Sequence, residues 1–404
     1  MSTLFSHLKV IDAGSFLAGP CAATILSDYG AQVTKIEPLK GDRHRSIAAG
    51  HPSEYSWQLT GRNKRSLAMD ISTEEGYATL CHMLKQADVF VVNFSAATLE
   101  RYKLTWDILK EINPRLIFAQ ISAYGLEGPD AEKRAFDLTG WFARTGIMDL
   151  MQHQDMAPPP PAGGVGDHAT GMTLFAGVMM ALYKRELTGE GSMIATSLAA
   201  TGTWANGLNL QGTIAGIDGA RRRDKEGWSN PFTNVYTCAD GRHLMVGVQN
   251  IKRDWPKLAK VLGHPEWLEQ DDMSSVKGIM KNRFAAKQRI SEAFLAIGSA
   301  DLCQALEEAG IVHSLVAHTT EVIEDEQLIA NGVIVDSNSG KPGFERTFAT
   351  PIQLSNEPQR PPGRAPDIGE HSETVLQEFG LNQAQIDSLI HAGVVAQAGD
   401  PPPS

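Results

Sequence analysis

The chain has 404 residues, of which 42% are hydrophobic and 21% charged, and its formal net charge is −11. These proportions are ordinary for a soluble globular protein, and the length allows a large core and two domains. The acidic balance argues against a nucleic acid or an anionic membrane as the main partner. It leaves room for a local basic pocket that binds a phosphorylated ligand.

The cysteines and the apolar segments indicate a cytoplasmic protein. The four cysteines are widely spaced and form no C-x-x-C pair: Cys21, Cys81, Cys238 and Cys303. This spacing favours free thiols over a disulfide framework or a zinc site. The first nine residues lack the charged and apolar regions of a signal peptide. The apolar run at 172–183 is too short to span a bilayer, so we expect no membrane contact.

The N-terminal part alternates short apolar strands with helices. Strands are predicted at 8–13, 32–37, 89–94 and 116–122. Helices are predicted at 21–28, 73–86 and 98–112. Continuous apolar strands separated by amphipathic helices indicate an α/β fold with a parallel sheet covered on both faces. Ligands of such folds bind beyond the carboxyl ends of the strands, which here carry residues 15–20, 93–94 and 122–125.

The pattern changes along the rest of the chain. Further elements are predicted as a helix at 136–144, a helix at 172–183, a strand at 193–198 and an irregular segment at 206–219. Two strands within 234–248 flank Asp240-Gly241, which is a strong hairpin signal. Helices follow at 255–262, 284–297 and 300–308. We therefore predict a second, α+β domain at 225–330, followed by a strand-like, proline-rich segment and two short helices.

A glycine-rich loop at 163–171 delivers a carboxylate, Asp167, to the start of the apolar helix. Glycines let the backbone approach a ligand closely, and a helix start offers unpaired N–H groups. One interpretation is structural, because Asp167 or Thr170 would serve as an N-cap, the usual role of such residues. The other is that Asp167 reacts with a ligand held against the loop.

Three other kinds of site find little support. A nicotinamide site would use Glu37, at the end of the second strand, to bind the ribose. However, the first turn reads Gly14-x-x-x-x-Gly19 and not G-x-G-x-x-G. The histidines form no H-x-x-x-H or H-E-x-x-H motif, so no metal site is predicted. No G-x-S-x-G nucleophile elbow is present.

Basic residues gather near the predicted strand ends of the first domain. They are Lys40, Arg43, Arg45, Arg62, Lys64, Arg65, Arg101 and Arg134. Any one of them is most simply a solvated surface charge. Together, in an acidic protein, they are modest evidence for a phosphate-bearing ligand.

Several sequence pieces, in this order and spacing, resemble one enzyme family. The pieces are residues 12–20, 30–38, 63–67, 92–94, 113–117, Gly166-Asp167, 188–191 and 369–371. The combination resembles the class III coenzyme A transferases of the CaiB/BaiF type, which include formyl-CoA transferase and the α-methylacyl-CoA racemases.

The resemblance implies a fold and a site. It implies a Rossmann-like large domain formed by 1–224 and 331–404, a small domain at 225–330, and an interlocked homodimer. It implies that Asp167 is the nucleophile, that CoA is a substrate moiety, and that neither a permanently bound cofactor nor a metal takes part. The residues that would contact CoA are Ser15, Phe16, Leu17, Ala18, Met69, Asn93, Phe94, Arg101 and Arg134.

The chemistry of an aspartate suits this role. An unperturbed Asp has a pKa of about 3.9, so it is already ionised at neutral pH and needs no general base. Its carboxylate can attack an acyl-CoA thioester, and the released thiolate can return to form an aspartyl-CoA thioester. An acceptor carboxylate then reverses the sequence. The glycine loop and the helix start would supply N–H donors for the oxyanions.

The racemase members of the family are the nearest alternative. They need acid and base residues at positions that align near Phe136 and Gln249-Asn250, and these side chains cannot transfer protons at neutral pH. We therefore expect CoA transfer to a free acid. Some assemblies of this family pair an active subunit with one that lacks the nucleophile. The presence of Asp167 argues against this chain being such an inactive subunit.

The substrate acids are less well defined by the sequence. The four-glycine loop of formyl-CoA transferase is missing, with 226–230 the only nearby candidate, and Ser15, Leu17 and Pro38 replace its first-domain contact residues. A small dicarboxylate is the expected acceptor, and Arg221 to Arg223 could bind its second carboxylate or form a solvated turn.

Overall fold

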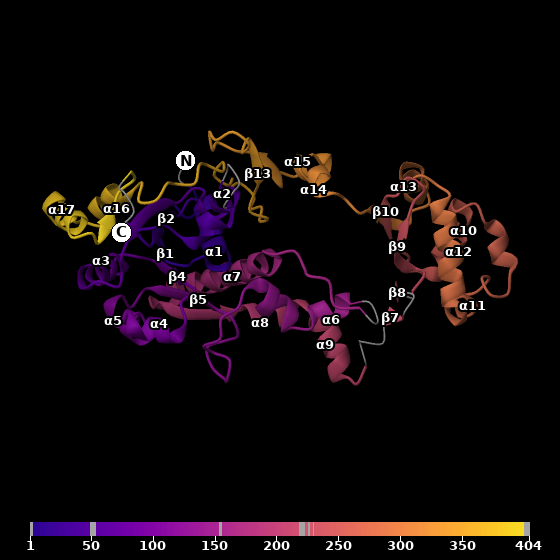
Figure 1. The fold of residues 1–404 in the computed structure, drawn as a ribbon, viewed down its shortest axis with the longest axis horizontal. Coiled ribbons are helices and arrows are strands. Elements are labelled where there is room, and N and C mark those ends of the chain that lie inside the picture. The colour runs from indigo at the N-terminus through magenta and orange to yellow at the C-terminus, as the bar shows by residue number, and fades with distance from the viewer. Residues whose placement is uncertain are drawn as a thin grey trace. The chain divides into compact units, whose positions relative to one another are not determined.

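The computed structural model of this protein describes residues 3–48, 54–152, 156–217, 223–224, 227–228 and 230–399. Its chain divides into two compact units. Unit 1 comprises Met1–Met148, Pro160–Gln211 and Gln327–Ser404, and unit 2 comprises Asp149–Pro159 and Gly212–Glu326. The colours of Figure 1 show that the C-terminal segment returns to the unit that contains the N-terminus. The predicted domain limits at 224 and 330 stay predictions.

Unit 1 is built on a seven-stranded sheet in the order β14-β3-β2-β1-β4-β5-β6. Its strands are β1 (Lys9–Asp12), β2 (Gln32–Glu37), β3 (Arg65–Met69), β4 (Val89–Val92), β5 (Ile117–Ser122), β6 (Ser192–Ser197) and β14 (Val395–Ala396). All neighbouring strands are parallel except β14, which pairs antiparallel with β3. The predicted parallel sheet is therefore confirmed. The strand order reverses between β1 and β4, which is where ligands of such sheets bind.

Helices cover both faces of this sheet. On one face lie α1 (Ala18–Asp28) and α7 (Val165–Thr188), and on the other lie α3 (Glu74–Leu84), α4 (Ala96–Arg101), α5 (Trp106–Ile112), α16 (Ser372–Glu378) and α17 (Gln383–His391). The remaining helices of this part of the chain are α2 (Tyr55–Gly61), α6 (Ile147–Met151), α8 (Leu198–Ala205) and α9 (Gly207–Ile214), with a 3₁₀ turn η1 (Arg43–Ala48) and a π-helical turn η2 (Leu138–Ala143). A short hairpin, β12 (Ile334–Asp336) and β13 (Arg346–Phe348), follows α14 (Thr319–Val322) and α15 (Glu326–Ala330).

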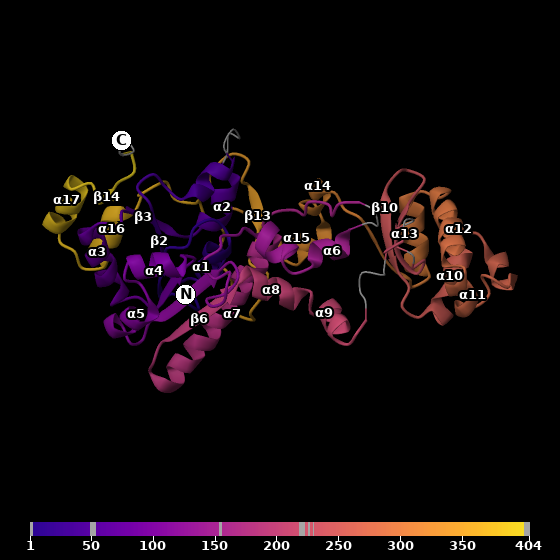
Figure 2. The ribbon, with the colours of Figure 1, turned by 60° about the horizontal axis from the view of Figure 1, so that its bottom comes forward.

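Alternate residues of each strand face opposite layers, as the pleat requires. Val10 and Val33 pack in one buried cluster with residues of α1 and α7. Figure 2 shows α7 as a long helix that runs beside β6. Ile11 and Phe90 pack in the opposite cluster with residues of α3 and α5. Burial on both faces explains why β4, Val89 to Val92, is apolar throughout.

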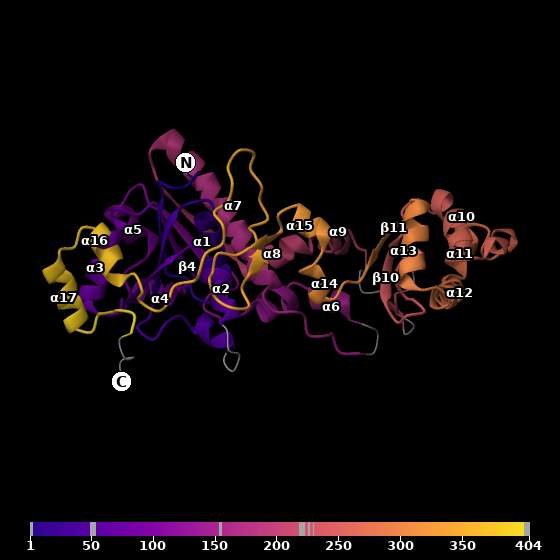
Figure 3. The same ribbon diagram turned by 90° about the horizontal axis from the view of Figure 1, so that it is seen from above.

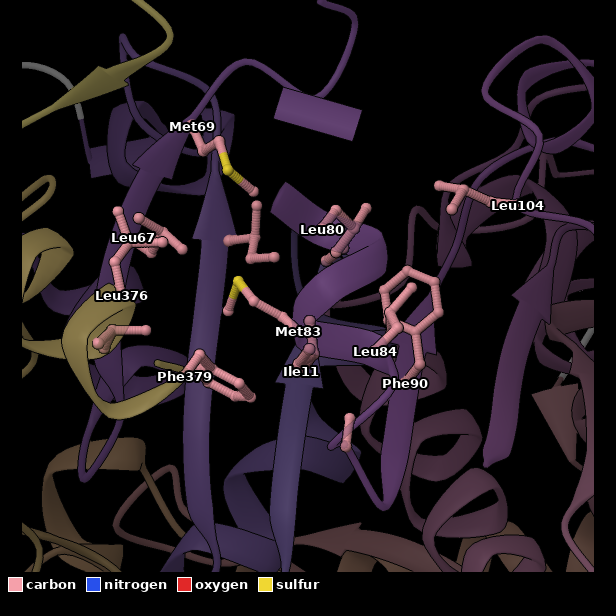
Figure 4. Packing of buried hydrophobic residues seen from close by; sticks show 14 of the residues in the cluster. Ile11, Leu67, Met69, Leu80, Met83, Leu84, Phe90, Leu104, Leu376 and Phe379 are labelled. Atoms are coloured by element: carbon pink, nitrogen blue, oxygen red, sulfur yellow. The ribbon is translucent and has the colours of Figure 1, made fainter. Parts of the chain in front are cut away.

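The C-terminal segment completes the second of these clusters. Leu376 and Phe379 pack with Leu67 and Met69 of β3 and with Met83 of α3, as Figure 4 shows. Figure 3 shows α16 and α17 beside α3. Residues more than 300 positions apart therefore share one core. The two-residue strand β14 pairs with the outer edge of β3, so the edge strand on this side of the sheet is very short.

Unit 2 has its own apolar core and a three-stranded antiparallel sheet in the order β11-β10-β9. Its described elements are β7 (Arg223–Asp224), β8 (Gly227–Trp228), β9 (Thr233–Thr237), β10 (His243–Gly247), α10 (Ile251–Val261), η4 (Pro265–Glu269), α11 (Val276–Lys281), α12 (Arg283–Leu295), α13 (Ser299–Glu308) and β11 (Val312–Leu315). The predicted hairpin is confirmed by the pairing of β9 with β10.

Several local predictions differ from the structure. The segment predicted as irregular contains α9, although residues 218 and 219 lie outside the described part. The predicted helix at 98–112 is two helices, α4 and α5, because Lys103 between them has a left-handed backbone with φ of 52°. The helix predicted at 172–183 starts earlier, at Val165. This earlier start places Asp167 inside the first turn.

Candidate active site

The start of α7 presents Asp167 without the hydrogen bonds of a cap. Gly164 is the N-cap residue, with a left-handed φ of 91°, and no side chain caps the helix. Thr170 instead donates to the Gly166 carbonyl oxygen, at 2.7 Å. No group in the described part of the chain donates a hydrogen bond to the Asp167 carboxylate. The capping interpretation of Asp167 and Thr170 is therefore wrong, and the carboxylate is available for chemistry.

A second carboxylate lies behind this turn. Asp137 precedes η2 and is buried. Its Oδ2 accepts a hydrogen bond of 2.6 Å from the Gly164 N–H. The first N–H groups of α7, at Val165 to Asp167, have no acceptor within the helix. They remain available to an oxyanion, as the sequence suggested.

The environment of Asp167 changes its protonation. Burial of the carboxyl group, and then the negative charge of Asp137, raise its pKa from 3.8 to about 7. The expectation of an unperturbed, fully ionised Asp was therefore wrong. An aspartate with this pKa is about half protonated at neutral pH, and its carboxylate is more basic than an ordinary one.

The predicted CoA loop lies against the start of α7. Phe16 has a left-handed backbone, with φ of 62°, and its ring meets that of Phe136 edge to face, with 5.4 Å between centroids. A Cβ built on Gly164 would lie 3.2 Å from Cδ2 of Leu17. Ala18 also touches α7, because its carbonyl oxygen would lie 2.7 Å from a Cβ on Gly171. The structure thus brings this loop and the Asp167 turn together.

Two side chains hold the same loop from behind. Asn93 uses both ends of its amide on Ser15: Oδ1 accepts from the backbone N–H at 2.9 Å, and Nδ2 donates to the carbonyl oxygen at 2.8 Å. Asp42 accepts from the Ser15 hydroxyl at 2.8 Å and from the Phe16 N–H at 3.3 Å. Burial raises the pKa of Asp42, but Lys35, the His44 N–H and the Ser15 hydroxyl outweigh it and lower that pKa to about 2. Asn93 therefore fixes the backbone of the loop at Ser15.

A pocket of about 460 Å³ opens at the carboxyl ends of β1 to β4. Its walls include three of the predicted CoA-contact residues, Ser15, Met69 and Phe94, and also Lys40 and Tyr102. Arg101 lies at this edge, since its guanidinium sits 4.6 Å from the centre of the Tyr102 ring. Arg134 is exposed on the segment before η2 and is not part of the pocket wall.

Half of the eight basic residues near the strand ends form ion pairs within the fold. Three are buried in ion pairs, which are Arg45–Glu37 at 2.8 Å, Arg62–Asp28 at 2.7 Å and Lys64–Asp12 at 2.9 Å. A fourth pairs Arg65 with Glu378. Arg45, Arg62 and Lys64 are therefore neither solvated surface charges nor free to bind a phosphate. Of that group, Lys40 alone lines the pocket described here.

The hydrogen bonds to the Glu37 carboxylate argue against a nicotinamide site. Its two carboxylate oxygens accept from the Arg45 guanidinium, from the Ser66 hydroxyl and from the Asp42 N–H. No acceptor is left for a ribose hydroxyl. Within the described residues, no group of three or more His, Cys, Asp or Glu side chains is arranged to hold a metal. None of the described helices has both the length and the apolar character needed to cross a membrane.

The model of CoA-transferase family III matches residues 5–372 of this chain. The chain belongs to this family. It is 30% identical over 400 residues to the (R)-2-hydroxy-4-methylpentanoate CoA-transferase of Clostridioides difficile, covering 97% of this chain and 99% of that one. It is 28% identical to the cinnamoyl-CoA:phenyllactate CoA-transferase of Clostridium sporogenes, covering 96% of each. The crystal structure of a CaiB/BaiF family protein from Brucella suis has 27% identity and a TM-score of 0.82, covering 94% of this chain and 100% of that one.

These similarities make the chain a CoA-transferase, an enzyme that uses CoA thioesters as substrates. For this family III enzyme, sequence reasoning missed Asp42 and Tyr102. No local motif marks them, because Asp42 acts through a loop 26 residues away. The sequence assigned no role to Asp137 either. Two of the three arginines considered as a diacid site, Arg221 and Arg222, lie outside the described residues, as do Glu226 and Ser229 of the candidate loop.

A substitution at Gly166 would test how tightly the turn that carries Asp167 is packed. A Cβ at this position would lie 2.6 Å from Cγ of Trp141, which is buried. We expect Gly166→Ala to cost about 1–3 kcal/mol of unfolding free energy and to slow CoA transfer, because the turn that carries Asp167 must move. Gly163→Ala is the matched control, since a Cβ there meets nothing within 4 Å. Equal stability and equal rates in the two variants would contradict the packing argument. Urea denaturation and a CoA-exchange assay give the two readouts.

Proposed function

We propose that this enzyme moves CoA from an acyl-CoA thioester to a free carboxylic acid through an aspartyl-CoA thioester on Asp167. The observation that carries the proposal is the unpaired, partly buried carboxylate of Asp167 beside the N–H groups of a helix start. The Asp167 carboxylate attacks the thioester carbonyl carbon, and CoA leaves as the thiolate. This step produces a mixed anhydride between the donor acyl group and Asp167.

The thiolate then attacks the Asp167 acyl carbon of the anhydride. The donor acid leaves as a carboxylate, and aspartyl-CoA thioester remains on the enzyme. The acceptor carboxylate repeats both steps in reverse order and leaves as the new acyl-CoA, which restores Asp167. No net proton or electron is consumed. The N–H groups at the start of α7 can stabilise each oxyanion.

The pocket at the strand ends is the proposed binding site for the nucleotide part of CoA. Its walls combine the aromatic side chains of Phe94 and Tyr102 with the ammonium group of Lys40. Aromatic faces suit a base, and a lysine suits a phosphate. Its place at the switch point of the sheet also supports this assignment. The loop at Ser15 to Ala18 would then lead the pantetheine arm towards Asp167.

The acids exchanged by the enzyme are tested with a panel. A small dicarboxylate acceptor stays a prediction, and the names of two relatives add 2-hydroxy monocarboxylates to the candidates. Each acyl-CoA donor is incubated with the enzyme alone, and the peptide that contains Asp167 is weighed by mass spectrometry. A covalent mass increase there, followed by transfer to an added acid, supports the proposal. Deuterium uptake at the α-carbon without an adduct would support racemisation instead.

We also propose a homodimer with interlocked chains. Large apolar side chains are exposed along α7 and on the helices that follow, including Met180, Tyr183, Trp204 and Leu208, with the last two 87% exposed. Apolar surface of this kind marks an interaction site. We expect light scattering to give the mass of two chains, and dilution to leave that mass unchanged, because interlocked chains must unfold to separate. A single-chain mass would contradict the proposal.

The cysteines support a reducing, cytoplasmic setting. All four are free, and Cys21 and Cys238 are buried. Burial raises the pKa of the Cys21 thiol to about 11, so it is a poor nucleophile. Asp167 therefore has no competitor from this neighbouring thiol.

A further inference from the structure

We propose that Asp137 is a positioning residue for the nucleophile. Its carboxylate fixes the turn that carries Asp167 and keeps a negative charge beside it, and acylation of Asp167 relieves the repulsion between the two groups. The inference rests on the proposed covalent mechanism. Asp137 itself touches neither the thioester nor CoA in that mechanism, so its effect would pass entirely through Asp167.

The mechanical part of this role follows from one hydrogen bond. Asp137 Oδ2 and the Gly164 N–H lie 2.6 Å apart and join segments 27 residues apart in the chain. Gly164 is the N-cap of α7, and its left-handed backbone determines where the first turn begins. Trp141 of the adjoining η2 packs directly under Gly166. The position of η2 therefore sets the position of the Asp167 carboxylate.

The electrostatic part follows from the groups that surround Asp167. Asp137 is the acidic group whose charge acts on it, and it acts from the start of η2. The other titratable or charged groups nearby come from three elements. They are His168 on α7, Cys21 on α1, and Arg62 and Lys64 on the segment between α2 and β3.

These neighbours do not remove the repulsion. Arg62 and Lys64 are each bound in a buried ion pair, with Asp28 and Asp12. Burial lowers the pKa of His168, which favours its neutral form. Among the residues that the structure describes, the Asp167 carboxylate thus stands beside a negative charge and has no cation paired with it. Formation of the anhydride or the thioester removes the Asp167 charge, so the acylated states are favoured relative to the free carboxylate.

Two substitutions separate the mechanical and the electrostatic effects. Asp137→Asn keeps an oxygen acceptor for the Gly164 N–H and removes the charge. We expect the acidic limb of the rate of adduct formation to move to lower pH, by about one unit. Asp137→Ala also removes the acceptor, and we expect adduct formation to be slower at every pH, by about 10-fold or more. Asp130→Asn is the control, because Asp130 is paired with Lys133 and Arg144 and does not act on Asp167.

Difference infrared spectroscopy gives a readout that needs no substrate. Spectra of the wild type minus Asp167→Asn isolate the carboxyl band of Asp167, and a pH series gives its midpoint. The midpoint should fall in the Asp137→Asn background and stay unchanged in the Asp130→Asn background. An unmoved midpoint in Asp137→Asn would overturn the inference. Absence of any adduct in the wild type, with a normal shift of the midpoint, would overturn the proposed function and leave the coupling of the two carboxylates intact.

Discussion

Asp167→Asn is expected to abolish CoA transfer and, at the same time, to stabilise the fold at alkaline pH. The amide cannot attack a thioester, so we expect transfer to fall by about 10³-fold or more, and no adduct on this peptide. The activity assay and the mass measurement use the same donor. A variant that kept substantial transfer would contradict the assignment of Asp167 as the nucleophile.

The gain in stability follows from proton linkage. The pKa of Asp167 is about 7 in the folded protein, against about 3.9 in an unfolded chain, so the folded state holds the proton more tightly. The ionised carboxylate therefore destabilises the fold, and this cost grows as the pH rises from about 4 and is fully present above about 7. Asp167→Asn should gain about 2–4 kcal/mol in alkaline buffer and almost nothing below about pH 4.

Asp301→Asn is a matched control for that gain. Asp301 occupies the same position in α13 that Asp167 occupies in α7, three residues into the helix, but it is exposed. Its carboxylate faces the positive end of the helix dipole in water, so its removal should cost about 0.3–1 kcal/mol. The two substitutions are thus expected to have opposite signs in alkaline urea denaturation. A loss of stability in both would show that the Asp167 carboxylate is not held at a raised pKa.

The parallel sheet was predictable because its signal is local. A strand buried on both faces is enriched in apolar residues, and β4 is apolar throughout. β1, β2 and β5 also carry buried polar side chains, such as Asp12, Lys35 and Gln120. β3 was not predicted as a strand, and its apolar run is only the three residues Leu67 to Met69. β14, of two residues, carries too short a pattern to be recognised.

The candidate site was predictable only in part, because its properties depend on contacts that form when the chain folds. The identity of Asp167 came from a motif in its family, but its pKa depends on burial and on Asp137, which no spacing reveals. The pocket joins residues from the ends of four strands, so its shape exists only after folding. The roles of Arg45 and Arg62 depend on the carboxylates of Glu37 and Asp28, 8 and 34 residues away, and a list of basic residues could not separate structural cations from binding ones.

Lys64→Met is expected to cause the largest loss of stability. Lys64 donates to Asp12 Oδ2 at 2.9 Å and to the Pro20 carbonyl oxygen at 2.8 Å, and neither side chain of the ion pair is exposed. Burial lowers the pKa of Lys64, against the attraction of Asp12. The substitution leaves a buried carboxylate without its partner, so we expect a cost of about 3–5 kcal/mol.

Lys64→Met should also disturb the predicted CoA loop, because Asp12 accepts a hydrogen bond from the N–H of Gly14, next to Ser15. We expect weaker CoA binding as well as a lower urea midpoint. Lys110→Met is the control: its pair with Asp107 is exposed and spans one turn of α5, so its loss should change stability far less. The double variant Asp12→Asn/Lys64→Met removes both charges and should recover part of the loss. Similar costs for Lys64→Met and Lys110→Met would mean that the buried pair is not what holds this end of the sheet together.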